Sequence, residues 1–166
     1  MAYSGKYNPN PAKYRGDVTK VTYRSLWELH SFKWCDDNPS VKYWSSEEVV
    51  VPYFWDIDKK MHRYYVDLKI TFTDGKVILV EIKPDKETKV PKRPDKSKRY
   101  INEAMTYVKN MNKWEAANSY AKDRGWDFQI WTENTLKTMG IMKDQKVPGK
   151  LKPLKPLKPY RKKKKK

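Results

Sequence analysis

The pattern of apolar and polar side chains predicts two neighbouring strands in the middle of the chain, over residues 64–72 and 76–83. The first stretch alternates with a period of two, which is typical of a strand with one buried face. The second is apolar on both faces until its last residues, which indicates a central strand of a sheet. Between them, Thr73, Asp74 and Gly75 predict the turn of a hairpin.

Helical periodicity precedes these strands. A helix is expected to begin at a cap, Thr22 or Ser25, and to end near Asp37, because Asn38-Pro39 follows. Glu28 lies off the apolar side of this helix, so it suits an exposed position as well as a position facing a site. The inward side is expected to comprise Tyr23, Leu26, Trp27, His30 and Trp34.

The remaining elements alternate between strand and helix. Asn112 and Glu115 form a pattern typical of a capping box, which is expected to separate two helices, and Thr132 is expected to cap the last helix. The further predicted elements are strands 41–44, 49–55 and 128–131 and helices 100–110, 112–124 and 133–139. This order predicts an α/β fold with a mixed central sheet flanked by helices.

Basic residues are concentrated near the C-terminus. The 166 residues carry a formal net charge of +17, and residues 143–166 contribute twelve Lys or Arg against one acid, Asp144. Mean hydropathy is low at −1.00, yet 14% of the residues are aromatic, which indicates a folded core. We therefore expect an N-terminal arm (1–20), one folded domain (21–142) and a disordered basic tail (143–166).

The basic tail has the composition of an arm that binds nucleic acid. It repeats Leu-Lys-Pro three times and ends in five lysines, so it is expected to stay extended and to bind phosphates by releasing counterions. The same charge would suit a tail that only maintains solubility. Residues 83–99 form a second basic stretch, typical of a long loop. The residues expected to contact DNA are Lys98, Arg99, Lys152, Lys155, Lys158 and Arg161.

The composition excludes several classes of protein. No run of 18 apolar residues exists, so we expect no membrane span, and the first residues lack the apolar stretch of a signal peptide. Cys35 is the only cysteine and His30 and His62 are the only histidines, which excludes a disulfide framework and a Cys- or His-rich zinc site. We expect a reducing, intracellular environment, no small-molecule cofactor, and His62 in a turn over residues 58–63.

The length of the hairpin turn decides which side chains face each other. A two-residue turn would leave the two acids of these strands, Asp67 and Glu81, away from each other. A three-residue turn over 73–75, with its glycine in a left-handed bulge, pairs Phe72 with Lys76. Asp67 then lies directly opposite Glu81. Only this turn also puts the apolar side chains of both strands on one face, so we predict it.

Two acids in this arrangement indicate a metal site. Like charges directly opposite each other destabilise a sheet, and Mg²⁺ or Mn²⁺ would remove the conflict because these cations prefer hard oxygen ligands. Lys83 lies two residues beyond Glu81 on the same face, where its ammonium could stabilise charge on a phosphate. The alternative is a solvated polar face on which Lys69 and Lys83 form ion pairs with the acids.

Residues around these acids resemble those of the PD-(D/E)xK nuclease superfamily, especially its branch of transposase-associated end-cleaving nucleases and tailed-phage head-completion nucleases. The central motifs are Arg24-Ser25-x-Trp27-Glu28, Tyr65-Val66-Asp67 and Val80-Glu81-Ile82-Lys83-Pro84. Further similarity, over residues 1–140 in all, lies in Met1–Lys6, Lys113-Trp114-x-Ala116-Ala117, Arg124-Gly125 and Thr132-Glu133. The superfamily's proline before the first acid is Val66 here, which departs from the motif but not from its geometry.

The resemblance implies a restriction-endonuclease-like fold and metal-dependent cleavage of DNA ends during phage head completion after packaging. Asp67 and Glu81 would bind Mg²⁺ or Mn²⁺, and Ile82 would add its main-chain carbonyl. Glu28 would bind the metal directly or through water, and Lys83 would be the catalytic lysine.

The implied partners are DNA and phage head, portal or neck proteins. The implied location is the virion or the host cytoplasm during phage assembly. Two alternatives stay open: a non-enzymatic DNA-binding protein of the head or neck with a vestigial site, and an RNA-binding or RNA-cleaving protein.

Overall fold

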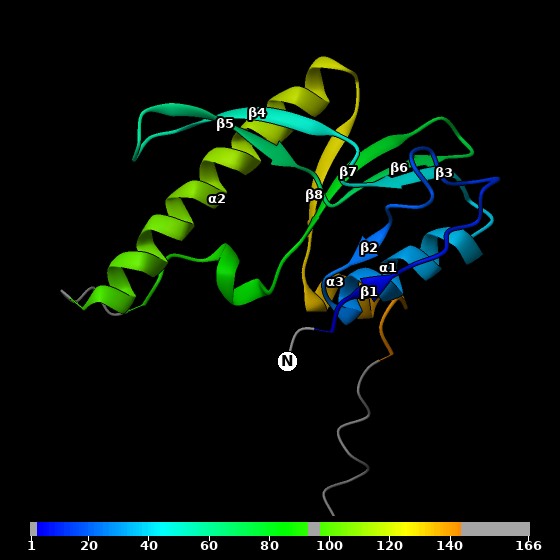
Figure 1. The fold of residues 1–166 in the computed structure, drawn as a ribbon, viewed down its shortest axis with the longest axis horizontal. Coiled ribbons are helices and arrows are strands. Elements are labelled where there is room, and N and C mark those ends of the chain that lie inside the picture. Colours follow the sequence, from blue (N-terminus) through cyan, green and yellow to red (C-terminus); the bar gives the residue numbers. More distant parts are fainter. Residues whose placement is uncertain (1–2, 93–96, 144–166) are drawn as a thin grey trace, which may run out of the picture.

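The computed structural model describes residues 3–92 and 97–143, and its elements are labelled in Figure 1. In chain order they are β1 (Gly5–Lys6), β2 (Thr22–Tyr23), α1 (Leu26–Asp37), β3 (Val41–Ser46), β4 (Val50–Trp55), β5 (Lys60–Tyr65), β6 (Leu68–Phe72), β7 (Val77–Ile82), a short 3-10 helix (Asp85–Thr88), α2 (Lys98–Asp123), β8 (Asp127–Trp131) and α3 (Glu133–Thr138). Among these elements, no helix is long and apolar enough to cross a membrane.

Four strands form the central sheet in the order β3-β6-β7-β8. β6 runs antiparallel to both β3 and β7, whereas β8 is parallel to β7. The parallel pair needs a crossover connection, which α2 provides. The predicted α/β fold with a mixed sheet is confirmed.

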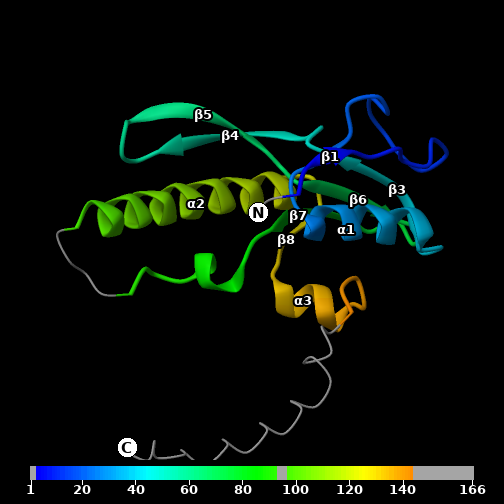
Figure 2. The ribbon, with the colours of Figure 1, turned by 60° about the horizontal axis from the view of Figure 1, so that its bottom comes forward.

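Hydrophobic cores cover both faces of this sheet. On one face, Leu68 and Val80 belong to the same core as Phe32 of α1. On the other face, Leu79 belongs to the core that contains Trp114 of α2 and the inner side of the β4–β5 hairpin. Figures 1 and 2 show α1 and α3 on one side of the molecule, and α2 with the β4–β5 hairpin lying along it on the other.

A single helix of 26 residues, α2, replaces the two helices predicted over 100–110 and 112–124. Asn112 lies inside this helix and caps nothing. Its side-chain amide donates a hydrogen bond to the Asp56 carboxylate (3.0 Å), and its amide oxygen accepts one from the Asp56 N–H (3.1 Å). The prediction was wrong because Asn112 binds the hairpin turn instead of a helix end.

The strand predicted over 64–72 is two strands that belong to different sheets. β5 pairs with β4, whereas β6 pairs with β7. The alternation over residues 64–72 predicts Val66 on the same face as Leu68. This is wrong, because Val66 packs in the core beside α2 and Leu68 in the core beside α1. Asp67 lies where the chain changes from one sheet to the other. His62 lies within β5 and not in the predicted turn.

The N-terminal residues that the structure describes pack against the domain. The Tyr7 hydroxyl donates a hydrogen bond to the Asp36 carboxylate (2.6 Å), and Tyr14 packs edge-on against Trp44 and is only 4% exposed. Tyr14 is therefore part of the hydrophobic core. The boundary at residue 20 stays a prediction, and the basic tail, apart from Lys143, lies outside the described residues.

Candidate active site

The turn between β6 and β7 sets the register that brings two acids together. Gly75 has a φ of +91°, and its N–H donates to the Phe72 carbonyl (3.0 Å). The Phe72 N–H donates to the Lys76 carbonyl (2.8 Å), which closes the hairpin. The strands keep this register along their length, so Asp67 lies opposite Glu81. The predicted three-residue turn is confirmed.

Neighbouring donors hold both acids. Asp67 Oδ2 accepts a hydrogen bond from the Ile82 N–H (2.7 Å), and Glu81, only 6% exposed, accepts one from the Tyr64 hydroxyl. Lys83 Nζ lies 3.8 Å from Glu81 Oε1, which is longer than a hydrogen bond. The lysine is thus close to the acid pair without being bound tightly to it.

Glu28 reaches the same site from α1. Ser25 caps this helix by accepting a hydrogen bond from the Glu28 N–H (3.2 Å), and Glu28 Oε2 accepts one from the Arg24 N–H (2.8 Å). Burial raises the pKa of Glu28, and the hydrogen bond and charge of Arg24 oppose this rise. The negative charge of Glu81 raises the pKa of Glu28 further, so the two carboxylates are within electrostatic reach of each other.

The buried side of α1 differs from the predicted one. Leu26 and His30, expected to face inward, are exposed. The fully buried residues of this helix are Ser31, Phe32 and Cys35. Glu28 precedes them by three, four and seven residues, so it lies on their side of the helix. The prediction failed because apolar residues also lie next to the buried side of the helix. The periodicity therefore does not show where that side is centred.

Asp67 is the most strongly perturbed acid of the site. Burial raises its pKa well above the ordinary value, and the negative charges of Glu81 and Glu28 raise it further. The Ile82 N–H and the Lys83 ammonium act in the opposite direction without cancelling this effect. A cation placed between the carboxylates would relieve their repulsion.

The raised pKa of Asp67 makes the stability of the metal-free protein depend on pH. Between the ordinary carboxyl pKa, about 3.9, and the raised one, the folded chain binds more protons than the unfolded chain, so the free energy of unfolding falls as pH rises. We expect Asp67→Asn, which cannot ionise, to melt above the wild type at neutral pH in EDTA. Thermal denaturation should show this difference shrinking as the pH falls toward 4, with about 2–4 °C for each kcal/mol gained.

A second aspartate provides the control for this measurement. The pKa of Asp17 is lowered because its carboxylate accepts hydrogen bonds from the Thr19 hydroxyl and N–H. Asp17→Asn should therefore give no stabilisation at neutral pH. Equal melting temperatures for Asp67→Asn and the wild type across the pH range would contradict the assigned environment of Asp67.

An open pocket of about 420 Å³ lies over the acids. Its lining residues are Arg24, Glu47, Arg63, Tyr64, Tyr65, Asp67, Glu81 and Lys113. Lys113 comes from α2, and its ammonium lies 5.5 Å from the centre of the Tyr64 ring. Burial lowers the pKa of Lys113, and Glu81 acts in the opposite direction. Sequence reasoning gave Lys113 no role, since nothing in the pattern showed which way this part of α2 faces.

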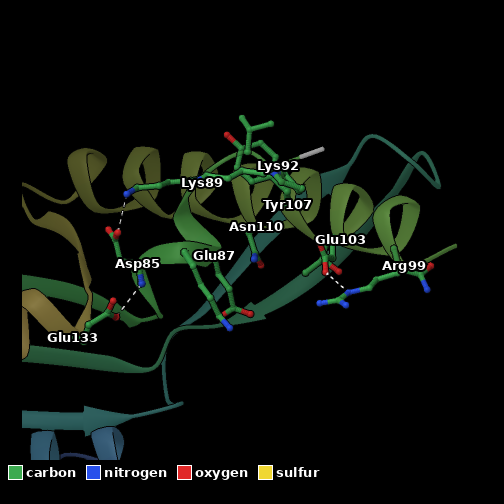
Figure 3. A pocket seen from close by; sticks show the side chains of 14 residues that line it. Asp85, Glu87, Lys89, Lys92, Arg99, Glu103, Tyr107, Asn110 and Glu133 are labelled. Atoms are coloured by element: carbon green, nitrogen blue, oxygen red, sulfur yellow. Dashed lines mark hydrogen bonds and ion pairs between the residues drawn. The ribbon is translucent and has the colours of Figure 1, made fainter. Parts of the chain in front are cut away.

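A larger cavity, of about 720 Å³, lies beside the N-terminal half of α2 (Figure 3). It shares no lining residue with the acid pocket. Two ion pairs form among its lining residues, between Lys89 and Asp85 (2.9 Å) and between Arg99 and Glu103 (3.1 Å). Arg99, predicted to contact DNA, is thus paired within its own helix, and Lys98 precedes it at the start of α2. The other predicted DNA contacts, Lys152, Lys155, Lys158 and Arg161, lie outside the described residues.

The chemistry of the acid pocket suits a hard cation. Within residues 3–92 and 97–143, no three His, Cys, Asp or Glu side chains are already arranged as a metal-binding group. The carboxylates of Asp67 and Glu81 nevertheless face each other at buried positions, and carboxylate and carbonyl oxygens are the ligands that Mg²⁺ prefers. The donor set therefore fits Mg²⁺ or Mn²⁺.

Comparisons with known proteins relate the chain to nucleases. Residues 38–133 match the family model described as TnsA-like endonuclease N terminal, a range that includes Asp67, Glu81 and Lys83 but not Glu28. The chain is also 45% identical over 147 residues to the head completion nuclease of Enterobacteria phage T4, and the alignment covers 85% of this chain and 98% of that relative. The chain therefore belongs to the TnsA-like endonuclease family, within the restriction-endonuclease-like superfamily that its motifs indicated.

Proposed function

We propose that this chain is an endonuclease that hydrolyses phosphodiester bonds of DNA with the help of Mg²⁺ or Mn²⁺. The observation that carries the proposal is the proximity of Glu28 and Lys83 to Asp67 and Glu81, the two acids that line the pocket. These residues come from α1, from the change of sheet before β6, and from the end of β7. A buried group of acids with an adjacent lysine is costly for the fold and suits phosphoryl chemistry.

The metal ligands would be the carboxylates of Asp67 and Glu81 and the main-chain carbonyl of Ile82, with Glu28 binding directly or through water. The cation, when bound, would stabilise the negative charge that develops on the scissile phosphate. The Tyr64 hydroxyl fixes the orientation of Glu81 through its hydrogen bond.

Two ammonium groups would act on the phosphate from different elements. Lys83, at the end of β7, is close enough to the acids to orient the attacking water or to stabilise charge on the phosphate. Lys113 lines the acid pocket from α2 and would bind a phosphate oxygen there. The ion pair between Arg24 and Glu47 lies at the same pocket and would position the DNA backbone.

Similarity to the head completion nuclease of phage T4 supports a role in head completion. In that role, the chain would cleave DNA ends after packaging. DNA would be the substrate, and head, portal or neck proteins would be the partners. The enzyme would act in the virion or in the host cytoplasm during assembly.

A non-enzymatic DNA-binding protein of the head or neck is the second candidate. It is favoured by one observation: Ile82 and Tyr64 already satisfy oxygens of Asp67 and Glu81, as they would in a vestigial site. The two candidates differ in whether DNA is cut.

The first test is cleavage of linear DNA with blunt, 3′-overhanging and 5′-overhanging ends, in Mg²⁺, Mn²⁺ or EDTA. We expect cleavage with either metal and none in EDTA. Lys83→Ala should lower the rate by about 10²–10³-fold, while Lys76→Ala, at the other end of the hairpin strand, should cleave normally. Binding without cutting in every metal would favour the structural candidate.

A further inference from the structure

The β4–β5 hairpin has apolar side chains on both of its faces. Its inner face packs on α2, where Val51, Tyr53 and Tyr64 are buried. Its outer face consists of three cross-strand pairs, Val50 with Tyr65, Pro52 with Arg63 and Phe54 with Met61. All six of these outer residues are exposed, and Arg63 is the only charged one. We call this set the outer row.

The outer row exposes large apolar side chains to a degree that needs an explanation. Phe54 is 45% exposed, Met61 63% and Tyr65 49%. A two-stranded antiparallel sheet that packs on one side usually shows polar side chains on the other. Contiguous exposed apolar surface usually marks a binding site.

The outer row leads directly into the acid pocket. Arg63 and Tyr65 belong to the row and also line the pocket beside Asp67 and Glu81. From these two residues the row continues along the hairpin to Pro52, Phe54 and Met61. A protein that covered Tyr65 would also cover the pocket, which argues against a protein as the occupant.

The chemistry of the row fits bases better than it fits the backbone of a duplex. A duplex shows phosphates on its outside, and five of the six side chains offer no charge to them. Unpaired nucleotides expose flat apolar faces that stack on aromatic side chains, and an arginine among these can contact a base or a phosphate.

The row is also held in place before DNA arrives. Asn112 of α2 exchanges two hydrogen bonds with Asp56 at the hairpin turn. The inner face of the hairpin is part of a hydrophobic core. A surface fixed in this way loses little freedom on binding.

We propose that the outer row binds unpaired bases of a single-stranded DNA segment whose backbone enters the acid pocket. This inference rests on the proposed endonuclease function, and it names the substrate: DNA that carries unpaired nucleotides next to the bond that is cut.

The test measures binding in EDTA, where no cleavage contributes, by the fluorescence anisotropy of a labelled oligothymidylate and of a blunt hairpin duplex. The double variant Phe54→Ser/Met61→Ser should lose about tenfold or more in affinity for the oligothymidylate and keep its affinity for the duplex. Tyr3→Ser, which removes another exposed aromatic ring, is the matched control and should bind both probes like the wild type.

Two single variants separate stacking from general apolar contact. Phe54→Trp should keep or improve affinity for the oligothymidylate, whereas Phe54→Leu should weaken it, because leucine is apolar but has no ring. Melting temperatures equal to that of the wild type show that the variants are folded.

Three results would overturn the proposal. The first is an equal loss of affinity for both probes, or no loss for either. The second is normal binding by Phe54→Leu. The third is a wild-type dimer that the double variant abolishes in light scattering, which would identify a second copy as the occupant. A wild type that binds as expected but never cuts DNA in Mg²⁺ or Mn²⁺ would refute the endonuclease and leave the stacking surface in place.

Discussion

Replacing Asp67 with asparagine should abolish cleavage of DNA while DNA binding persists. Asp67 faces Glu81, and burial with two neighbouring acids makes its charge costly unless a cation is present. Asparagine keeps the shape and loses the charge, so the metal site is lost. We expect a fall in the cleavage rate of about 10³-fold or more, measured on linear DNA at saturating protein.

The control for this variant is another aspartate of the same hairpin. Asp74 lies in the exposed turn, where it accepts a hydrogen bond from the Lys76 N–H. Asp74→Asn should cleave at close to the wild-type rate. Mg²⁺ should also raise the melting temperature of the wild type and leave that of Asp67→Asn unchanged. Cleavage by Asp67→Asn at a rate near that of the wild type would place the active site elsewhere.

Removing residues 143–166 should weaken DNA binding strongly at low salt and weakly at high salt. The segment carries twelve Lys or Arg and one acid. Each phosphate that it neutralises adds about 0.9 to the slope of log affinity against log salt on duplex DNA. A chain ending at Met142 should therefore show a smaller slope and about 10–10³-fold lower affinity near 50 mM salt. The rate of cleavage at saturating DNA should be unchanged.

A shuffled tail provides the matched comparison. A variant with the same residues 143–166 in random order has the same charge. If the tail acts by charge alone, this variant should bind like the wild type. Equal slopes of log affinity against log salt for the truncated and complete chains would show that the tail does not contact DNA.

The hairpin could be predicted in detail because its determinants are local. The choice of a three-residue turn depended on Gly75 and on matching the apolar faces of two adjacent strands. The same local register places Asp67, Glu81 and Lys83 together, so most of the candidate site followed from one hairpin.

Elements whose form depends on distant partners could not be predicted. Alternation continues through Val66, so nothing local shows that the chain leaves one sheet there and joins another. Asn112 has the sequence context of a helix cap, but Asp56, 56 residues away in the chain, takes its hydrogen bonds. In both cases tertiary contacts override a local preference.

The residues of the site that could not be predicted also depend on tertiary packing. Tyr64 and Lys113 enter the pocket from β5 and α2, and their positions depend on how the hairpin and the helix pack on the sheet. Glu28 could be placed on the correct helix but not on the correct side of it. The inward side depends on which residues the sheet covers, and it covers Phe32 and Cys35 but not His30.

The position of Asp67 between two sheets makes its placement depend on the cooperativity of folding. The residue before it, Val66, is anchored in one hydrophobic core, and the residue after it, Leu68, in the other. Loosening either core would therefore shift the acid, even if the other core stayed intact. If Asp67 binds the metal as we propose, a partly unfolded form of this domain would be inactive, and DNA cleavage would begin only once both cores have formed.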